Sequence, residues 1–135
     1  MWTNLALLAL RLVLGAVFLG HGAMKVGAFG GPGFEAATGY IGNLGFRPAR
    51  MWTGLAVGGE LAAGTLFVLG LLTPLAALLA VATMLVAIVK VHGPKGFFMQ
   101  NGGYEYNLVL AVAALAVAAT GPGALSLDHL LRLAR

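Results

Sequence analysis

Four long apolar stretches, separated by short polar or glycine-rich breaks, dominate the pattern of the chain. They cover approximately residues 4–24, 48–72, 74–91 and 104–120. A helix needs about 20 mostly apolar residues to cross the hydrocarbon core of a bilayer, and the last stretch is the shortest of the four. The pattern predicts an all-α fold, an integral membrane four-helix bundle, with residues 1–135 forming a single domain.

Residues that start or stop helices stand at the edges of these stretches. Pro48 suits the first turn of a helix, because its missing N–H would be unpaired there in any case. Thr73 and Pro74 have the form of an N-cap followed by proline at the first helical position. Because almost nothing joins the second stretch to the third, these two are expected to form a tight antiparallel hairpin.

Two shorter amphipathic segments are expected to lie at the membrane surface. The first lies between the first two stretches, where apolar residues recur at helical spacing: Phe34, Ala37, Ile41 and Leu44. The second is the tail Ser126–Arg135, which Ser126 can cap. Its apolar stripe consists of Leu127, Leu130, Leu131 and Ala134. Its cationic residues, Arg132 and Arg135, suit the C-terminal end of a helix dipole.

Composition excludes several classes of protein. The chain is 60% hydrophobic and only 9% charged, with a mean hydropathy of +0.94, whereas soluble domains are roughly 25% charged. Its outer surface is therefore expected to face a lipid bilayer, and the first apolar stretch is interpreted as a retained helix. The absence of cysteine excludes disulfides, a thiol nucleophile and thiolate metal sites. No basic run is interleaved with aromatic residues, so nucleic acid is not an expected partner.

Each of the first two stretches carries an ionisable residue near its middle, Arg11 in one and Glu60 in the other. A charge in hydrocarbon costs several kcal/mol unless it is paired or hydrated. We expect the two to form an intramembrane ion pair, since antiparallel packing would place them about one turn apart. Two alternatives remain open: Arg11 could extend to the nearby interface, and Glu60 could handle a proton or bind a ligand. On the opposite side of the second stretch, Gly54, Gly58 and Ala62 form a small-residue row that permits close helix contact.

Polar residues gather at the end of the predicted bundle that carries the connecting loops. The candidate residues for a ligand cavity there are His21, Lys25, Lys90, His92, Tyr104, Glu105 and Asn107. A quinone head group would suit such a site, with a His or Tyr donor at a carbonyl and an apolar slot for the tail. The alternative is an interfacial belt of the kind common where lipid meets water. No histidine spacing predicts a metal site, and Ser126, Asp128 and His129 on one short helix cannot converge as a triad.

The chain resembles the DoxX family of small bacterial membrane proteins over nearly its full length. The segments that carry the resemblance are Arg11–Gly15, His21–Lys25, Glu60, Gly70–Pro74, His92–Phe97, Gly103–Asn107 and Gly121–Asp128. The resemblance implies a four-helix bundle in the bacterial inner membrane, crossing it several times. A related group, DoxD-like, is associated with thiosulfate:quinone oxidoreductase, and some DoxX proteins are linked to thiol or oxidative stress complexes. Without cysteine, a self-contained thiol–disulfide mechanism is excluded here.

Two classes of function are compatible with these observations. The first is a quinone- or lipid-binding subunit of a membrane oxidoreductase system, in which quinone is the expected cofactor and a partner subunit supplies any other redox group. The second is a non-catalytic membrane scaffold or assembly factor, in which the Arg11–Glu60 pair is structural and a partner protein docks on the loops. A homo-oligomer is a further possible assembly. Whether the chain is an enzyme is left open, because it has no flavin, haem or dinucleotide motif. A transporter is a weaker interpretation, since no internal repeat is present.

Overall fold

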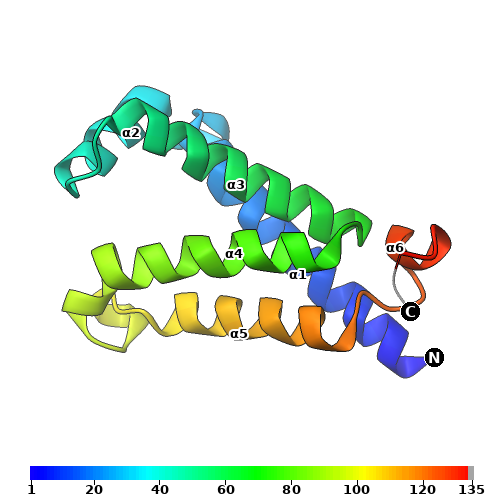
Figure 1. Cartoon of the computed structure of the whole chain (residues 1–135). Helices are drawn as coiled ribbons and strands as arrows, with labels where there is room; N and C mark the ends of the chain where they lie inside the picture. Colours follow the sequence, from blue (N-terminus) through cyan, green and yellow to red (C-terminus); the bar gives the residue numbers. More distant parts are fainter. Residues whose placement is uncertain (134–135) are drawn as a thin grey trace.

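The structure is a computed structural model that describes residues 1–133, in which every regular element is a helix (Figure 1). The body is formed by α1 (Trp2–Lys25), α3 (Ala49–Leu69), α4 (Thr73–Ala87) and α5 (Glu105–Thr120). Two shorter α-helices, α2 (Phe34–Asn43) and α6 (Leu127–Leu130), lie outside this body. The loops also contain three 3₁₀ turns, η1 (Ala28–Gly30), η3 (Gly93–Lys95) and η4 (Met99–Asn101), and a π-helical turn, η2 (Ile88–His92).

Neighbouring helices of the body run antiparallel and define two ends (Figure 1). The terminal end holds the start of α1, the turn between α3 and α4, the end of α5, and α6 (residues 1–8, 69–74 and 118–133). The loop end holds the end of α1, α2, the start of α3 and the connection from η2 to α5 (residues 21–52 and 88–106). The helix starts and stops match the predicted stretches to within a few residues, although α4 ends earlier because η2 continues it.

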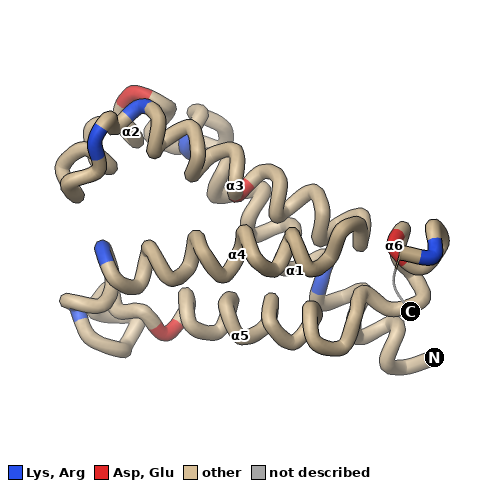
Figure 2. The backbone as a smooth tube through the Cα atoms, in the orientation of Figure 1, with Lys and Arg blue, Asp and Glu red and all other residues tan. Residues whose placement is uncertain are grey.

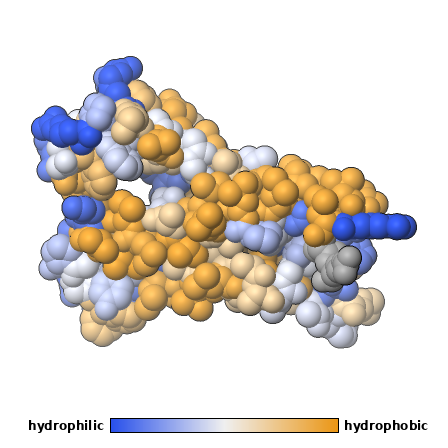
Figure 3. Space-filling view, viewed as in Figure 1, coloured by the Kyte–Doolittle hydropathy of each residue, from blue (hydrophilic) through white to orange (hydrophobic). Residues whose placement is uncertain are grey.

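Length and apolarity make three segments of the described chain able to cross a membrane: Trp2–Lys25, Ala49–Leu69 and Thr73–Lys95. Figure 3 shows their outer surface as largely apolar, with hydrophilic residues collected towards the two ends of the molecule. The chain is therefore a multi-pass membrane protein. With 16 residues, α5 is about 24 Å long, less than the roughly 30 Å of hydrocarbon in a bilayer. A fourth crossing through α5 stays a prediction.

The core is built largely from alanine, with a few larger side chains from all four body helices. Phe18 of α1 meets Phe67 of α3 with ring centroids 6.5 Å apart, and both are buried. On α4 and α5 the buried positions are mostly small, namely Ala76, Ala77, Ala80, Ala111 and Ala114. Small residues allow helix backbones to approach closely in a membrane, where dispersion forces replace the hydrophobic effect between helices.

The closest backbone approach occurs between Gly15 of α1 and Gly64 of α3. A Cβ added to Gly64 would lie 2.9 Å from the Gly15 carbonyl oxygen and 2.7 Å from the backbone nitrogen of Leu19. By contrast, Gly54 and Gly58 are exposed, and a Cβ added to either would meet no atom of another segment within 4 Å. Within residues 1–133, the row of Gly54, Gly58 and Ala62 therefore does not make the close helix contact that its spacing suggested.

The two predicted amphipathic helices have different outcomes. At the first, a helix is present as α2, which has Ala37 buried and packs against α3; its position at the membrane surface stays a prediction. The second is wrong in extent, because α6 has only four residues, although Ser126 caps it by accepting the His129 N–H at 3.1 Å. The last two residues of the predicted helix, Ala134 and Arg135, lie outside the described residues.

Candidate functional site

The predicted ion pair between Arg11 and Glu60 is wrong, and the register of α1 on α3 explains why. Gly15 lies against Gly64, and Gly22 lies against Glu60 and Leu61. Glu60 is therefore level with about residue 21 of α1, so roughly ten residues, or about 15 Å along the helix axis, separate it from Arg11. The partner of Glu60 is Lys25, whose Nζ lies 2.7 Å and 2.9 Å from the two carboxylate oxygens.

Arg11 instead belongs to the terminal end. Its guanidinium is fully buried and donates a hydrogen bond from Nη2 to the carbonyl of Leu125. It lies so close to Gly70 that any side chain at Gly70 would collide with Nη1, and Gly70 also has a φ of +62°. Glycine is therefore required at this turn for two reasons: it adopts the left-handed backbone without strain, and its lack of a side chain leaves room for the Arg11 guanidinium.

Asp128 of α6 caps the start of α4 from a distant part of the chain. Its carboxylate accepts the backbone N–H groups of Leu72 (2.8 Å) and Thr73 (3.0 Å) and the Thr73 hydroxyl (2.7 Å). Thr73 was predicted to be the N-cap itself, but it is the first residue of α4 and Leu72 precedes it in a left-handed conformation. A side chain in α6 thus satisfies donors that the first turn of a helix leaves unpaired.

The charge of Asp128 is favoured by these contacts. Burial by itself would raise the pKa of Asp128, since only 3% of the residue is exposed. The hydrogen bonds from Thr73 and Leu72, together with the positive charge of Arg11, outweigh burial and lower the pKa of this carboxyl from its ordinary value. A second hollow of about 480 Å³ lies beside Asp128 and the ends of α4 and α5, but the carboxylate already accepts three hydrogen bonds from the protein. The contacts of Arg11 and Asp128 therefore hold α6 against α1 and the α3–α4 turn, and we call this cluster of contacts the clamp.

The loop end contains a cavity of about 390 Å³ between the helices of the body. Its walls combine apolar side chains, Phe18, Met84 and Leu110 among them, with the Lys25–Glu60 ion pair. Glu60 is almost completely buried, and 26% of the Lys25 side chain is exposed. The ion pair therefore presents charge to a cavity whose other walls are largely apolar.

Two imidazoles line the same cavity, and each is held by a backbone carbonyl. His21 Nδ1 lies 2.9 Å from the carbonyl oxygen of Val17, one turn earlier on α1. His92 Nδ1 lies 2.7 Å from the carbonyl oxygen of Gly102. His92 is the last residue of the π-helical turn η2, and a π-helical turn changes the direction of the side chains that come after it.

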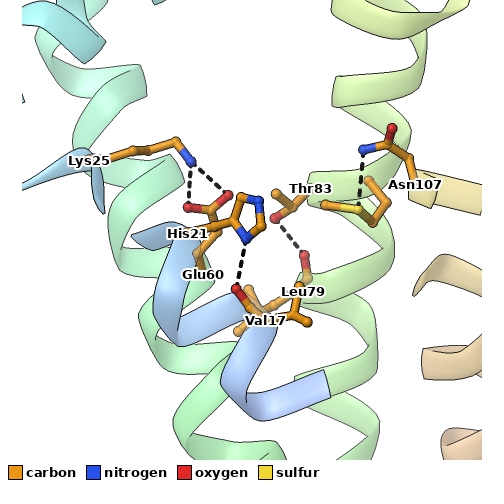
Figure 4. Close-up of polar contacts among 8 residues, drawn as sticks. Val17, His21, Lys25, Glu60, Leu79, Thr83 and Asn107 are labelled. Carbon is orange, nitrogen blue, oxygen red and sulfur yellow. Dashed lines mark hydrogen bonds and ion pairs between the residues drawn. The ribbon is translucent and has the colours of Figure 1, made fainter. Parts of the chain in front are cut away.

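The remaining polar groups come from α4 and α5. The Thr83 hydroxyl donates to the carbonyl of Leu79 (2.8 Å), and the Asn107 amide lies 3.6 Å from the sulfur of Met84. Figure 4 shows His21, Glu60 and Lys25 on one side of the gap, facing Thr83 and Asn107 on the other. The phenol of Tyr106 also lines the cavity.

Four of the seven residues predicted for the cavity line it: His21, Lys25, His92 and Asn107. The other three stabilise the surrounding loops. Lys90 lies over the ring of Phe46, with Nζ 5.7 Å from its centroid. Tyr104 packs edge-on against Phe97 at 5.5 Å, and Glu105 accepts the backbone N–H of Met99 at 3.1 Å.

The cavity also includes Glu60, Thr83 and Tyr106, which are not among the seven candidate residues; a ligand-binding role for Glu60 was an open alternative. Glu60 was assigned to Arg11 because the register between helices was unknown. Thr83 is a single hydroxyl in an otherwise apolar stretch, which is a signal that could have been followed. Within residues 1–133 no group of three metal-ligating side chains comes together.

Comparisons with known proteins are consistent with this architecture. The sequence profile of the DoxX family matches residues 6–93, which include most of α1, all of α2, α3 and α4, and the histidine of η2. An uncharacterized protein of Haemophilus influenzae is 33% identical over 85 residues, which is 63% of this chain and 56% of that protein. The match thus spans little more than half the length of that relative. No solved structure matches the chain significantly. Since the family profile covers more than half of the sequence, the chain belongs to the DoxX family.

Proposed function

We propose that the protein binds a quinone, or a lipid of similar shape, in the loop-end cavity and acts as a subunit of an oxidoreductase system in the bacterial inner membrane. The observation that carries the proposal is the convergence of the Lys25–Glu60 pair, His21 and His92 on one cavity with apolar walls. Small-molecule sites typically have volumes of about 300–1,000 Å³ and combine apolar walls with a few polar groups that orient the ligand.

The position of the cavity also suits a ligand that arrives from the membrane. It lies at the loop end of helices whose outer surfaces are apolar (Figure 3). The polar head of a quinone would meet Lys25, His21 and His92, while its tail would extend along the apolar side chains of Phe18 and Leu110. A buried ionisable residue in a membrane segment is a functional candidate by default, because its cost must be offset by a partner or a role.

The chain's own residues provide binding and proton-accepting groups rather than a redox centre. The described residues form no cluster for a metal ion, and the sequence has no cysteine. Under this proposal the electrons are exchanged between the bound ring and a partner subunit, and this chain holds the ring.

A cavity-filling variant tests the proposal. Thr83→Phe places a ring in the cavity, whereas Thr65→Phe places one on the exposed face of α3, where Thr65 makes the same hydroxyl bond to the preceding turn. Decylubiquinone, offered in both redox states, should raise the melting temperature of the parent and of Thr65→Phe, because a ligand at 100 times its Kd stabilises by about 2.7 kcal/mol. Thr83→Phe should lose the shift. If neither redox state changes the melting temperature of the parent, the scaffold function replaces this one.

A further inference from the structure

The hydrogen bonds of the two cavity histidines determine which ring nitrogen carries the proton. A carbonyl oxygen can only accept, so Nδ1 of His21 must donate to Val17 and Nδ1 of His92 must donate to Gly102. A neutral imidazole has a single N–H, and the tautomer is set by the bond that this nitrogen makes. In the neutral form, both histidines therefore have Nε2 as an unprotonated acceptor.

The free nitrogen of His21 is available to a ligand. In Figure 4 the ring nitrogen that is not bonded to Val17 points away from that carbonyl, towards the space beside Glu60 and Thr83. Thr83 adds a second acceptor to this space, because its only proton is donated to Leu79 and its oxygen lone pairs remain. The carboxylate of Glu60, which lines the cavity too, can only accept.

The donors around the cavity are fewer and partly used. Lys25 directs its ammonium at both oxygens of Glu60, and one proton of the Asn107 amide is directed at the sulfur of Met84. The Tyr106 hydroxyl can donate or accept. The cavity is therefore richer in acceptors than in donors, and its complement is a ligand that brings hydroxyl protons.

We propose that this cavity selects the reduced, dihydroxy form of an aromatic ring, a hydroquinone, over the quinone, with one ring hydroxyl donating to Nε2 of His21 and the other to Nε2 of His92. This rests on the function proposed above and specifies which redox state of the ligand is bound. A quinone carries only carbonyl acceptors, which would face the unprotonated nitrogens and leave them without partners. His21 is exposed and His92 is half-buried in the free protein, so the cost arises on binding. A ring that displaces water from these acceptors without donating to them leaves them unpaired, and the preference for the hydroquinone is a consequence of the tautomers.

The experiment compares three probes of nearly the same shape, under anaerobic conditions at pH 8, by their binding to the purified protein in detergent. The probes are decylubiquinol, decylubiquinone and the dimethyl ether of decylubiquinol, which lacks the hydroxyl protons. Decylubiquinol should bind roughly tenfold more tightly than either of the others, as one or two net hydrogen bonds imply. Dioleoylglycerol serves as a fourth probe, and binding as tight as that of the quinol would make a hydroxylated lipid the ligand and overturn the proposal.

Histidine variants locate the preference. His21→Leu and His92→Leu should each weaken decylubiquinol binding roughly tenfold and change decylubiquinone binding by less than about twofold. His129→Leu is the matched control, because His129 is exposed on α6 at the opposite end of the molecule. Equal binding of quinol and quinone overturns the selection of the reduced form but leaves the proposed quinone site in place. Absence of binding by both overturns the quinone site itself, and with it this inference.

Discussion

Arg11 and Asp128 are buried charges that hold the terminal end together. Asp128 accepts hydrogen bonds from the backbone N–H groups at the start of α4. Arg11 donates a hydrogen bond to the carbonyl of Leu125, shortly before α6. Each charge also reduces the cost of burying the other. The two residues belong to opposite ends of the sequence, so their contacts fix the C-terminal segment against α1 and the α3–α4 turn. We infer that this cluster, rather than an Arg11–Glu60 pair, is the charged element that stabilises the fold.

Removal of the Asp128 carboxylate should destabilise the protein strongly. Asp128→Ala leaves the first N–H groups of α4 and the Arg11 guanidinium without their acceptor or counter-charge. We expect a loss of at least about 2 kcal/mol, since a cap contributes about 0.5–2 kcal/mol and hydrogen bonds to charged groups about 1.5–3 kcal/mol. Thermal unfolding in detergent measures it, with His129→Ala as the control on the same short helix. Equal melting temperatures for the two variants would contradict the clamp.

The lowered pKa of Asp128 predicts that the folded protein loses stability in acid. Because its pKa is lowered in the folded protein, Asp128 contributes stability that is fully present above the unfolded value of 3.8 and is lost as the pH falls through the lower folded pKa. Melting temperatures measured from pH 6 down to pH 3 should fall most steeply below that value. Asp128→Asn should flatten this part of the profile. A parent and variant with parallel profiles would show that Asp128 does not titrate with unfolding.

At the scale of elements, two local features position the cavity. The close contact of Gly15 with Gly64 sets the register that makes Lys25 reach Glu60. The π-helical turn η2 sets the direction of His92 after the regular part of α4. The helices themselves are determined by apolar stretches and their caps, whereas register and the π-turn depend on contacts between elements.

Alanine at Gly64 should disturb the register of α1 on α3. Its Cβ would meet backbone atoms of Gly15 and Leu19, which cannot rotate away, so we expect destabilisation of about 1–3 kcal/mol. Gly54→Ala is the matched control on the same helix, where nothing lies within 4 Å. That substitution should leave stability unchanged or raise it by about 0.5–1 kcal/mol. Chemical or thermal unfolding distinguishes them, and equal effects would rule out the glycine contact.

Deletion of Val89 should convert η2 to regular α-helix. Val89 is exposed within the π-turn, and removing one residue rotates the later part of the helix by about 100°. His92 would then leave the cavity while the helical content is kept. Circular dichroism should be unchanged, and the melting shift produced by decylubiquinol should be lost. Retention of that shift would show that His92 does not contribute to the site.

At the scale of the whole molecule, charge is distributed unevenly between the two ends. Figure 2 shows most Lys and Arg residues at the loop end, which holds Lys25, Arg47, Arg50, Lys90 and Lys95. Two of these are paired with carboxylates, Lys25 with Glu60 and Arg50 with Glu35. The described part of the terminal end has Arg132 beyond the helices. Positively charged loops stay in the cytoplasm, so we expect the loop end there.

Cysteine labelling can measure both the orientation and the number of crossings, because the sequence has no cysteine to remove. Thr3→Cys and Ala124→Cys should react with a membrane-impermeant maleimide added to intact bacterial cells with a permeable outer membrane. Gln100→Cys should react only after the cells are broken. If Ala124→Cys is protected while Thr3→Cys is labelled, α5 does not cross the membrane and the bundle has three spans.

The sequence by itself determined the features that depend on local pattern. Apolar stretches of sufficient length, with proline and glycine at their edges, predict the helices, the α3–α4 hairpin and α2, and they require a membrane because so much apolar surface has no interior to occupy. The collection of polar residues at the loop end was likewise visible, since antiparallel helices bring their connections together. Four of the seven proposed residues line one cavity of the structure, and a ligand bound there stays a prediction.

Only the tertiary structure decided which of these residues meet. The register of α1 on α3 depends on where two glycines allow backbones to touch, and it pairs Glu60 with Lys25 instead of Arg11. The role of Asp128 depends on a docking contact with Leu72 and Thr73, which are 56 and 55 residues away in sequence. The π-helical turn that ends at His92 has no hydrophobic or polar pattern that would predict it from the sequence. Such choices are made by steric fit and by the need of buried polar groups for partners, which are properties of packed helices rather than of single segments.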